Sequence, residues 1–376
     1  MDLMGRLLPK VQSYLSAQDW RDVPCMQGRS FEVSPLAQGE YNLNYRISAG
    51  ELKLVFRINV GTQIQRPDQI VYEYKALRLL EGSGVTPKPV FVDDSRRFFE
   101  TGILIMEFLP GDPLDYRCDT ASAAALFARL HQTEVPEADN HLIRETAPLS
   151  LIWEECAGLL QRYFESERSD PAIRDYLQEL LNWADAARRG ERFYQADPWP
   201  CIVNTEVNSG NFIVNRSRGT IHLVDWEMPR WGDPSQDLAH FCSPLTTLWK
   251  TDYRMRARDR RDFLDAYRHA EEMGEIPGPS PSGRRASENS PAAMVADDQA
   301  EIRRGREEAG ECYCEYFRRQ LVRVECVEDL LAETVEEELP AFDVVLGEPV
   351  LDGQDRDAEL PDRPDVEVEH RLPVHH

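Results

Sequence analysis

Amide and carboxylate side chains flank a short predicted hairpin near the middle of the chain. Two apolar runs within residues 212–224 surround a turn that contains glycine, which predicts a pair of antiparallel strands. Glu206 and Asn211 precede the first run, and Asp225 and Glu227 follow the second. Folding the hairpin brings one amide and three carboxylates to one end. Such hard oxygen ligands suit Mg²⁺, which completes its shell with phosphates and water. The alternative is a surface hairpin whose acids face solvent.

Two motifs surround this hairpin. Residues 204–211 read N-T-E-V-N-S-G-N, and the later segment reads D-W-E from Asp225 and G-D-P-S-Q-D-L-A over residues 232–239. Together they resemble the aminoglycoside phosphotransferase and choline kinase family, which are small-molecule kinases with a protein-kinase-like fold. That family has a catalytic loop H-G-D-x-x-x-x-N and a metal segment D-x-D/E, often followed by G-D-P-x-x-D-L-A. The second match is the specific one, since only the spacing of the first is fully kept.

The resemblance implies a role for each residue of the two motifs. Asn211 and Asp225 would bind Mg²⁺, and Glu227 would be an accessory ligand or an acceptor-site group. Asn204 stands where a histidine braces the metal segment, and Glu206 stands where an aspartate takes the proton of the acceptor hydroxyl. Glutamate adds one methylene, and a shift of roughly 1 Å can cost about a hundredfold in rate.

The glutamate leaves three alternatives open. The backbone compensates and Glu206 is the base, or the metal and phosphates alone carry a slow reaction, or transfer has been lost.

The chain before this region predicts a small antiparallel sheet with one main helix, which we expect to form a nucleotide-binding lobe over residues 1–110. A leading helix is expected over residues 2–19 and the main helix over 70–80. Strands are expected at 29–36, 45–47, 52–60, 90–92 and 103–108.

In the resembled family, a G-x-x-N-x-x-Y loop of this lobe covers the nucleotide phosphates. Gly39, Asn42 and Tyr45 stand at its three named positions, although a plain hairpin turn would use the same residues. Arg57 stands where protein kinases keep a phosphate-binding lysine, and a guanidinium can hold two phosphate oxygens. The resemblance pairs it with Glu73 of the predicted helix. A solvated strand arginine is the alternative.

Residues 106–111 resemble the hinge of the family, M-E-x-L-x-G, whose backbone at Glu107 and Leu109 would bind the adenine edge. A buried strand followed by a turn explains the apolar residues equally well. A helical lobe with the catalytic and metal loops is expected over residues 111–340, in which we interpret His131 as structural. Its helices are expected at 120–131, 149–165, 171–188, 242–249, 259–267 and within 298–339.

Two segments are predicted to be disordered. Residues 275–296 are rich in Pro, Ser and Gly, and residues 341–376 form an acidic, proline-punctuated tail.

Composition limits the class of protein further. The 376 residues carry a net charge of −24, and the 43 basic residues include only five lysines. Such a surface is typical of proteins that work in concentrated salt, because salt screens its self-repulsion, so we expect a halophilic source. A nucleic-acid partner is disfavoured, since no basic stripe offsets the acids.

The location of the protein is predicted from what the sequence lacks. The N-terminal residues have no long apolar core of a signal peptide, and no run of about 18 apolar residues suggests a membrane span. The eight cysteines are scattered, and Cys312 and Cys314 would point to different helix faces, which makes a metal site improbable. We expect a cytoplasmic protein with reduced thiols.

These observations predict an α+β, protein-kinase-like bilobal fold. The expected function is Mg-ATP-dependent transfer of the γ-phosphate to a hydroxyl of a small metabolite or antibiotic, with ATP and Mg²⁺ as cofactors. The alternative is a catalytically impaired, nucleotide-binding pseudokinase that acts through partners. The acceptor and the oligomeric state are left open by the sequence.

Overall fold

The computed structural model describes residues 3–62, 66–196 and 198–273, and all of them belong to one compact unit. The predicted insertion at 275–296, the predicted helical segment at 298–339, Cys312, Cys314 and the predicted tail at 341–376 lie outside the described residues. Within the described ranges, no helix combines the length and the apolar character that crossing a membrane requires.

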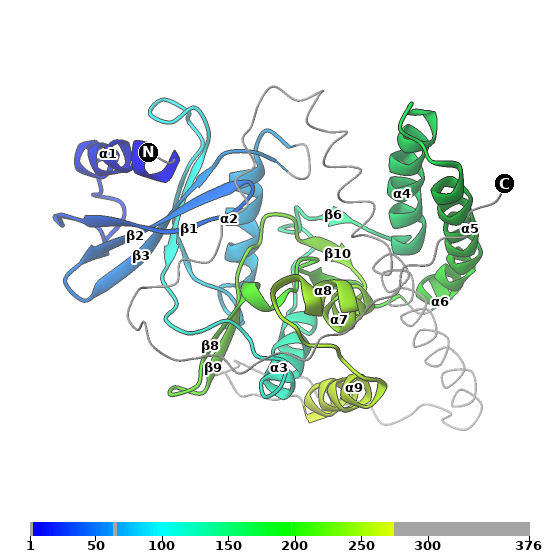
Figure 1. The fold of residues 1–376 in the computed structure, drawn as a ribbon. Coiled ribbons are helices and arrows are strands. Elements are labelled where there is room, and N and C mark those ends of the chain that lie inside the picture. The colour runs from blue at the N-terminus through cyan, green and yellow to red at the C-terminus, as the bar shows by residue number, and fades with distance from the viewer. Residues whose placement is uncertain (1–2, 63–65, 197, 274–376) are drawn as a thin grey trace, which may run out of the picture. The chain divides into compact units, whose positions relative to one another are not determined.

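The first lobe is a five-stranded antiparallel sheet with one helix on each face (Figure 1). Its strand order is β1-β2-β3-β5-β4, so neighbours in the sheet are mostly neighbours in sequence. Its elements are α1 (Leu3–Ala17), β1 (Glu32–Gln38), β2 (Asn42–Ala49), β3 (Leu52–Asn59), α2 (Gln69–Leu80), β4 (Pro89–Asp93) and β5 (Ile103–Glu107).

Strand β3 shows why both faces of this sheet are covered. Leu54, Phe56 and Ile58 are buried in the cluster that α1 closes, and Val55 between them is buried in the cluster that α2 and the second lobe close. Because side chains of a strand alternate between faces, one apolar strand serves two cores. Arg57 shares the face of Val55 and is also buried, which is unusual for a cation and marks a site.

The second lobe is mainly helical. Its helices are α3 (Thr120–His131), α4 (Pro148–Glu165), α5 (Pro171–Ala187), α6 (Glu191–Ala196), α7 (Pro234–Cys242), α8 (Pro244–Lys250) and α9 (Ala257–Met273). Its strands are β6 (Ile143–Arg144), β7 (Cys201–Val203), β8 (Phe212–Asn215), β9 (Thr220–Leu223) and β10 (Arg230–Gly232). Strands β8 and β9 form an antiparallel hairpin, while β10 joins β6 and β7 in a second small sheet.

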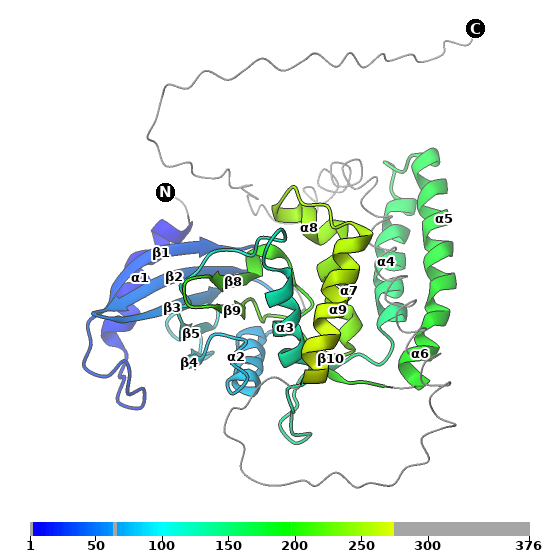
Figure 2. The same cartoon turned by 90° about the horizontal axis from the view of Figure 1, so that it is seen from below.

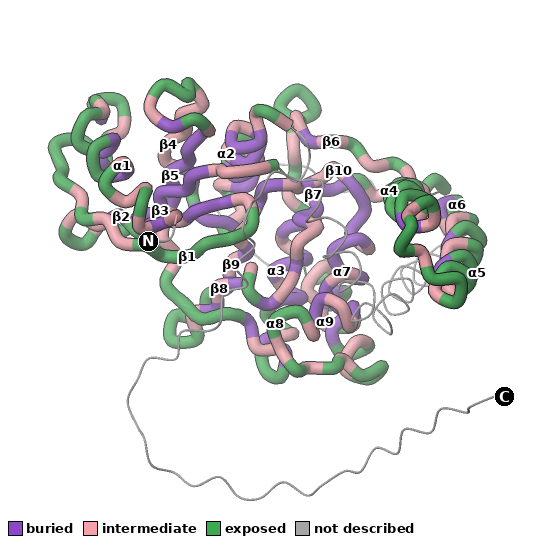
Figure 3. Tube along the Cα trace, turned by 45° about the horizontal axis from the view of Figure 1, so that its top comes forward, coloured by how far each residue is buried: buried purple, intermediate pink, exposed green. Residues whose placement is uncertain are grey.

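The core of this lobe lies between α3, α7, α9 and the β8–β9 hairpin. Figure 2 shows α3 and α9 side by side, and their aromatic rings meet inside. Phe127, Phe212, Phe241 and Phe263 are all fully buried, and the Phe241 and Phe263 rings stack with centroids 4.7 Å apart. By contrast, α4 and α5 pack mainly on each other, and Figure 3 shows much of their surface exposed.

The structure corrects the predicted elements at two places. The helix expected at residues 242–249 is α8, which begins only at Pro244, because Cys242 ends α7 and Ser243 caps the start of α8. Strand β2 begins at Asn42 rather than at Tyr45, so only residues 39–41 connect it to β1. The sequence analysis also missed α7 and the three strands of the β6-β10-β7 sheet, which are too short to show a period.

Candidate active site

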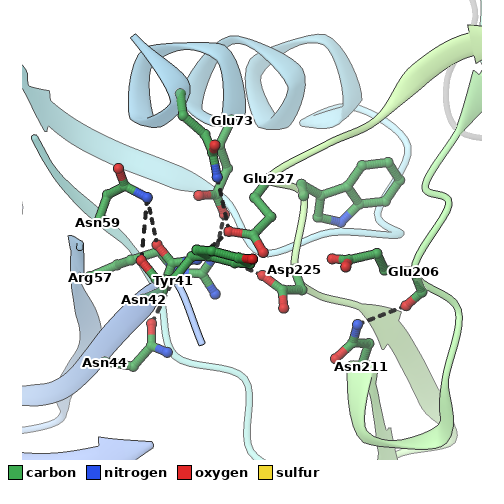
Figure 4. A network of polar contacts seen from close by, with 12 residues as sticks. Tyr41, Asn42, Asn44, Arg57, Asn59, Glu73, Glu206, Asn211, Asp225 and Glu227 are labelled. Atoms are coloured by element: carbon green, nitrogen blue, oxygen red, sulfur yellow. Dashed lines mark hydrogen bonds and ion pairs between the residues drawn. The ribbon is translucent and has the colours of Figure 1, made fainter. Parts of the chain in front are cut away.

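The β8–β9 hairpin places the residues that flank it side by side. Phe212 pairs with Leu223 at the open end, and the Val224 N–H donates to the Asn211 carbonyl over 2.8 Å. Asp225 follows directly, so Asn211 and Asp225 lie next to each other, as Figure 4 shows. The predicted hairpin is therefore confirmed, together with the convergence of polar residues at one end.

Three carboxylates lie together at this end. One ligand oxygen each from Glu206, Asp225 and Glu227 lies within 4.8 Å of the other two. The Asn211 amide nitrogen donates to the Glu206 carbonyl over 2.7 Å, and its oxygen faces the side of Asp225 in Figure 4. All of these potential ligands are oxygens, and a carboxylate and amide set of this kind suits Mg²⁺, Ca²⁺ or Mn²⁺. The donor chemistry thus fits the metal that the family motif implies.

The loop that carries Glu206 is fastened on two sides. Asp237 accepts the backbone N–H groups of Asn204 and Thr205 over 2.9 and 2.8 Å. On the other side, the Asn204 amide donates to the Asp225 carbonyl over 2.9 Å, and the Thr205 hydroxyl donates to the Met228 carbonyl over 3.1 Å. The Asn204 side chain therefore braces the metal segment by a hydrogen bond to its backbone. A residue that stands in place of the family's histidine would have to make such a contact.

Helix α7 presents Asp237 to this loop. The helix begins after Asp233 with a capping box, in which the Asp233 carboxylate accepts the Ser235 N–H over 3.0 Å. Behind Asp237 lies His131, which is fully buried, with its Nε2 3.4 Å from Asp237 Oδ2 and its Nδ1 3.0 Å from the Tyr267 hydroxyl. His131 thus supports Asp237 from within the core, in agreement with its structural interpretation.

Arg57 connects the sheet to the metal segment. Its Nη1 donates to Glu73 over 2.6 Å and to Asp225 over 3.0 Å, and its Nε donates to the Asn44 amide oxygen over 3.0 Å. The predicted pair of Arg57 and Glu73 is present, while the contact with Asp225 was not foreseen. Burial by itself would lower the pKa of Arg57, but the carboxylates of Glu73, Asp225 and Glu227 raise it above its usual range.

Glu227 is the most buried of the three clustered acids. Its Oε2 accepts hydrogen bonds from the Asn42 amide over 2.5 Å and from the Gln69 amide over 3.1 Å. Burial raises the pKa of Glu227 to about 8, and the nearby carboxylates, Asp225 first, contribute. Asn42, predicted to lie in a phosphate-covering loop, therefore lies at the metal segment as the first residue of β2.

The β1–β2 connection also brings Tyr41 to the site. The Gly39 N–H donates to the Asn42 carbonyl over 2.8 Å and closes the turn. The Tyr41 ring lies against Gly61, where an added Cβ would be only 2.7 Å from the ring, and its hydroxyl end points toward the clustered acids in Figure 4. Burial, followed by contact with Glu40 and the charges of nearby acids, raises the pKa of Tyr41 to about 12, so the hydroxyl stays a donor at neutral pH.

The predicted hinge ends β5 and leads into the second lobe. The Glu107 N–H donates to the Lys88 carbonyl over 2.9 Å, whereas the Leu109 N–H makes no hydrogen bond to any described residue. Two residues on, Gly111 lies so close to β8 that an added Cβ would be 2.8 Å from the Val214 carbonyl oxygen. Of the two predicted hinge residues, Glu107 therefore has a bonded N–H, and Leu109 has an N–H with no hydrogen-bond partner among the described residues.

Several residues at the site were missed by sequence reasoning. Asn44 contacts Arg57 as its partner across the β2–β3 pairing, and Gln69 contacts Glu227 where the two lobes meet. No local pattern singles out either residue. Tyr41 lies inside the loop motif but between its named positions. By contrast, Asp237 belongs to the G-D-P-S-Q-D-L-A motif, and the structure shows that it accepts the backbone N–H groups of Asn204 and Thr205.

The two lobes and the motif loops between them define a protein-kinase-like, bilobal α+β fold, as predicted. The model of the phosphotransferase enzyme family matches residues 32–279, about two thirds of the chain, and the protein therefore belongs to this family. No curated protein matches the sequence significantly.

Three solved structures resemble this chain at low identity. A candidate aminoglycoside phosphotransferase from Ralstonia eutropha JMP134 has a TM-score of 0.51 at 14% identity and covers 82% of this chain and 98% of its own. Choline kinase from Cryptosporidium parvum Iowa II has a TM-score of 0.48 at 13% identity, with 89% and 96% covered. A spectinomycin phosphotransferase in complex with ADP and spectinomycin reaches 0.46 at 14% identity, with 79% and 94% covered. The first likeness supports the fold alone.

Proposed function

We propose that the protein transfers the γ-phosphate of ATP to a hydroxyl group of a small molecule and requires Mg²⁺. The family supports the reaction class, and the observation that carries the proposal is the meeting of Glu206, Asn211, Asp225 and Glu227 at the end of the β8–β9 hairpin. Phosphoryl transfer asks a protein mainly to position the phosphates and to neutralise their charge. The site supplies residues of both kinds.

Each residue of the site has a proposed part in the reaction. Asn211 and Asp225 hold Mg²⁺, with Glu227 as an accessory ligand, and the ion supplies charge neutralisation on the phosphate oxygens. Arg57, held by Glu73, faces the α- and β-phosphates. Glu206 accepts the proton of the acceptor hydroxyl. The hydroxyl oxygen bonds to the γ-phosphorus, and the bond from that phosphorus to ADP breaks so that ADP leaves.

The remaining contacts concern the nucleotide and its cover. The backbone of Glu107 and Leu109 receives the adenine edge, and the connection with Gly39 and Asn42 covers the phosphates. Tyr41 adds a hydroxyl donor above the acids. The Leu109 N–H makes no hydrogen bond to any described residue, and this open donor supports the hinge role.

The proposed acceptor is an amino alcohol, a sugar or an antibiotic, and not a nucleic acid. The acidic surface does not identify its charge, because adaptation to salt explains that surface without a ligand. We retain a cytoplasmic location and a halophilic source as part of the proposal. Assays therefore belong in molar KCl.

The test is ADP release from Mg-ATP with a panel of hydroxylated metabolites and antibiotics. At least one acceptor should raise turnover above background, and Glu206→Gln should lower kcat by about 10² or more while ATP still binds. Glu100→Gln, an exposed position away from the site, is the matched control and should keep full activity. If ATP binds but no acceptor raises turnover, the protein is a nucleotide-binding pseudokinase that acts through partners.

A further inference from the structure

Glu206 reaches the acid cluster rather than remaining apart from it. The family pattern has an aspartate at this position, and the glutamate here is longer by one methylene. Its carboxylate lies within 4.8 Å of ligand oxygens of both Asp225 and Glu227. Glu206, which is expected to take the proton of the acceptor hydroxyl, is therefore also close enough to bind the same cation as Asp225 and Glu227.

Carboxylates of Glu206, Asp225 and Glu227 lie together at this end of the hairpin, and Arg57 forms ion pairs with Glu73 and Asp225. Like charges close together in a partly buried site repel one another. A divalent cation between the acids would offset this repulsion.

Hydrogen bonds leave one oxygen of each metal-segment acid available. Arg57 donates to Oδ1 of Asp225, and both Asn42 and Gln69 donate to Oε2 of Glu227. Asp225 Oδ2 and Glu227 Oε1 make no hydrogen bond to any described residue. Outer partners that fix one oxygen of a carboxylate and leave the other open are typical of prepared metal ligands.

The Gln69 amide gives a second, independent indication. Its side chain is buried, with 1% of the residue exposed, and is directed at Glu227, yet its Oε1 has no hydrogen-bond partner. A buried amide oxygen without a partner costs about 1–3 kcal/mol. Water in the shell of a bound cation would provide the missing donor.

The donor set also differs from what nucleotide-dependent sites need. Mg²⁺ in such sites is usually held by one or two carboxylates, and the substrate phosphates complete the shell. Here a third carboxylate, from Glu206, joins Asp225, Glu227 and the Asn211 amide oxygen. Up to four protein oxygens can then surround a cation before any phosphate arrives.

We propose that Glu206 is a ligand for a divalent cation and that the protein binds this cation in the absence of nucleotide. The inference shares the metal segment with the proposed function, but it concerns the nucleotide-free protein and does not depend on phosphate transfer. It predicts that the length of the residue at position 206, and not only its charge, decides the affinity for the cation.

The experiment is a titration of the full-length, nucleotide-free protein with Mn²⁺, followed by the electron paramagnetic resonance signal of free Mn²⁺. Molar KCl suppresses weak binding to the acidic surface. The wild type and Glu100→Gln should bind one Mn²⁺ with the same affinity. Glu206→Asp, Glu206→Gln and Asp225→Asn should each weaken binding by tenfold or more.

A parallel thermal unfolding series separates binding from folding. In EDTA, all variants should unfold cooperatively, and added Mn²⁺ should raise the Tm of the wild type more than that of Glu206→Asp. The inference is overturned if the nucleotide-free wild type binds no Mn²⁺, or if Glu206→Asp or Asp225→Asn binds it as tightly as the wild type. If one variant at position 206 fails to fold, the other tests whether Glu206 is a ligand, and the wild-type titration still tests binding without nucleotide.

The two proposals can fail separately. Mn²⁺ binding without any acceptor-dependent ADP release would keep the cation site and remove the transferase. Acceptor-dependent ADP release, together with cation binding only when ATP is present, would keep the transferase and remove the nucleotide-free cation site.

Discussion

Three departures from the family pattern, at residues 204–206, each make a contact that the usual residue would not make in the same way. Asn204 donates its amide to the Asp225 carbonyl, and Thr205 donates its hydroxyl to the Met228 carbonyl. Glu206 extends its carboxylate to the metal segment. The three departures therefore connect the loop at residues 204–206 to residues 225–228.

Thr205 makes its contact from an unfavourable backbone conformation. Its φ is 72°, in the left-handed region that β-branched residues avoid, and glycine is the residue of the family pattern here. The hydrogen bonds to Asp237 and Met228 hold it there.

We predict that Thr205→Gly is more stable than Thr205→Ala by roughly 1 kcal/mol, because both lose the hydroxyl but only alanine keeps a Cβ at positive φ. Urea unfolding of both variants measures the difference. The matched control is Gly82, which is exposed, has no positive φ and has nothing within 4 Å of an added Cβ. Alanine should be the more stable residue there. Equal or reversed stabilities at position 205 would show that the turn relaxes.

At the scale of elements, most residues around the clustered acids lie at the end of a strand or helix or in a short connection, whereas Asn44, Arg57 and Glu73 lie within β2, β3 and α2. Asn211 precedes β8, Asp225 follows β9, and Gln69 begins α2. The elements are fixed by buried apolar side chains, so their ends are fixed as well, and the polar groups meet there without a long loop. The hinge connection joins this arrangement through the pairing of Asp112 with Val214.

The close approach of the hinge to β8 leads to a second prediction. In Gly111→Ala, the new Cβ would lie 2.8 Å from both the Val214 carbonyl oxygen and Ile213 Cγ2, and the paired backbone cannot yield easily. The variant should lose about 1–3 kcal/mol of stability, and its affinity for ATP should fall because β8 follows Asn211 directly.

Calorimetric titration with ATP and urea unfolding provide the two measurements for Gly111→Ala. Gly158→Ala in α4, where nothing lies within 4 Å of an added Cβ, is the control and should gain up to about 1 kcal/mol. Wild-type affinity and stability in Gly111→Ala would refute the steric argument.

The net charge of −24 belongs to the molecule as a whole. Repulsion among exposed acids opposes the folded state, and added salt shortens its range from about 10 Å at 0.1 M to about 3 Å at 1 M. We predict that the free energy of unfolding rises with KCl up to the molar range. Urea unfolding at several KCl concentrations measures it, with sucrose at equal osmolality as the uncharged control. A salt response no larger than that of sucrose would argue against salt adaptation.

Local patterns were enough to predict much of the framework. Two apolar runs around a turn with glycine predicted the hairpin within residues 212–224, the spacing of apolar residues predicted α2, and the motif order predicted the family and fold. The pair of Arg57 and Glu73 followed from the resemblance and is present. Short elements such as β6, β7 and α7 were not predicted. Strands of two or three residues, and a helix that begins inside a motif, show no clear hydrophobic period.

By itself, the sequence determined which side chains are available, how the apolar ones repeat and how large the net charge is, since these depend only on the order of residues. Only the tertiary structure decided that Asn42 and Gln69 hold one oxygen of Glu227, that Arg57 contacts Asp225, and that Glu206 reaches the metal segment. The physical reason is that these contacts join residues up to 185 positions apart. Their geometry depends on how two packed cores bring the ends of separate elements together.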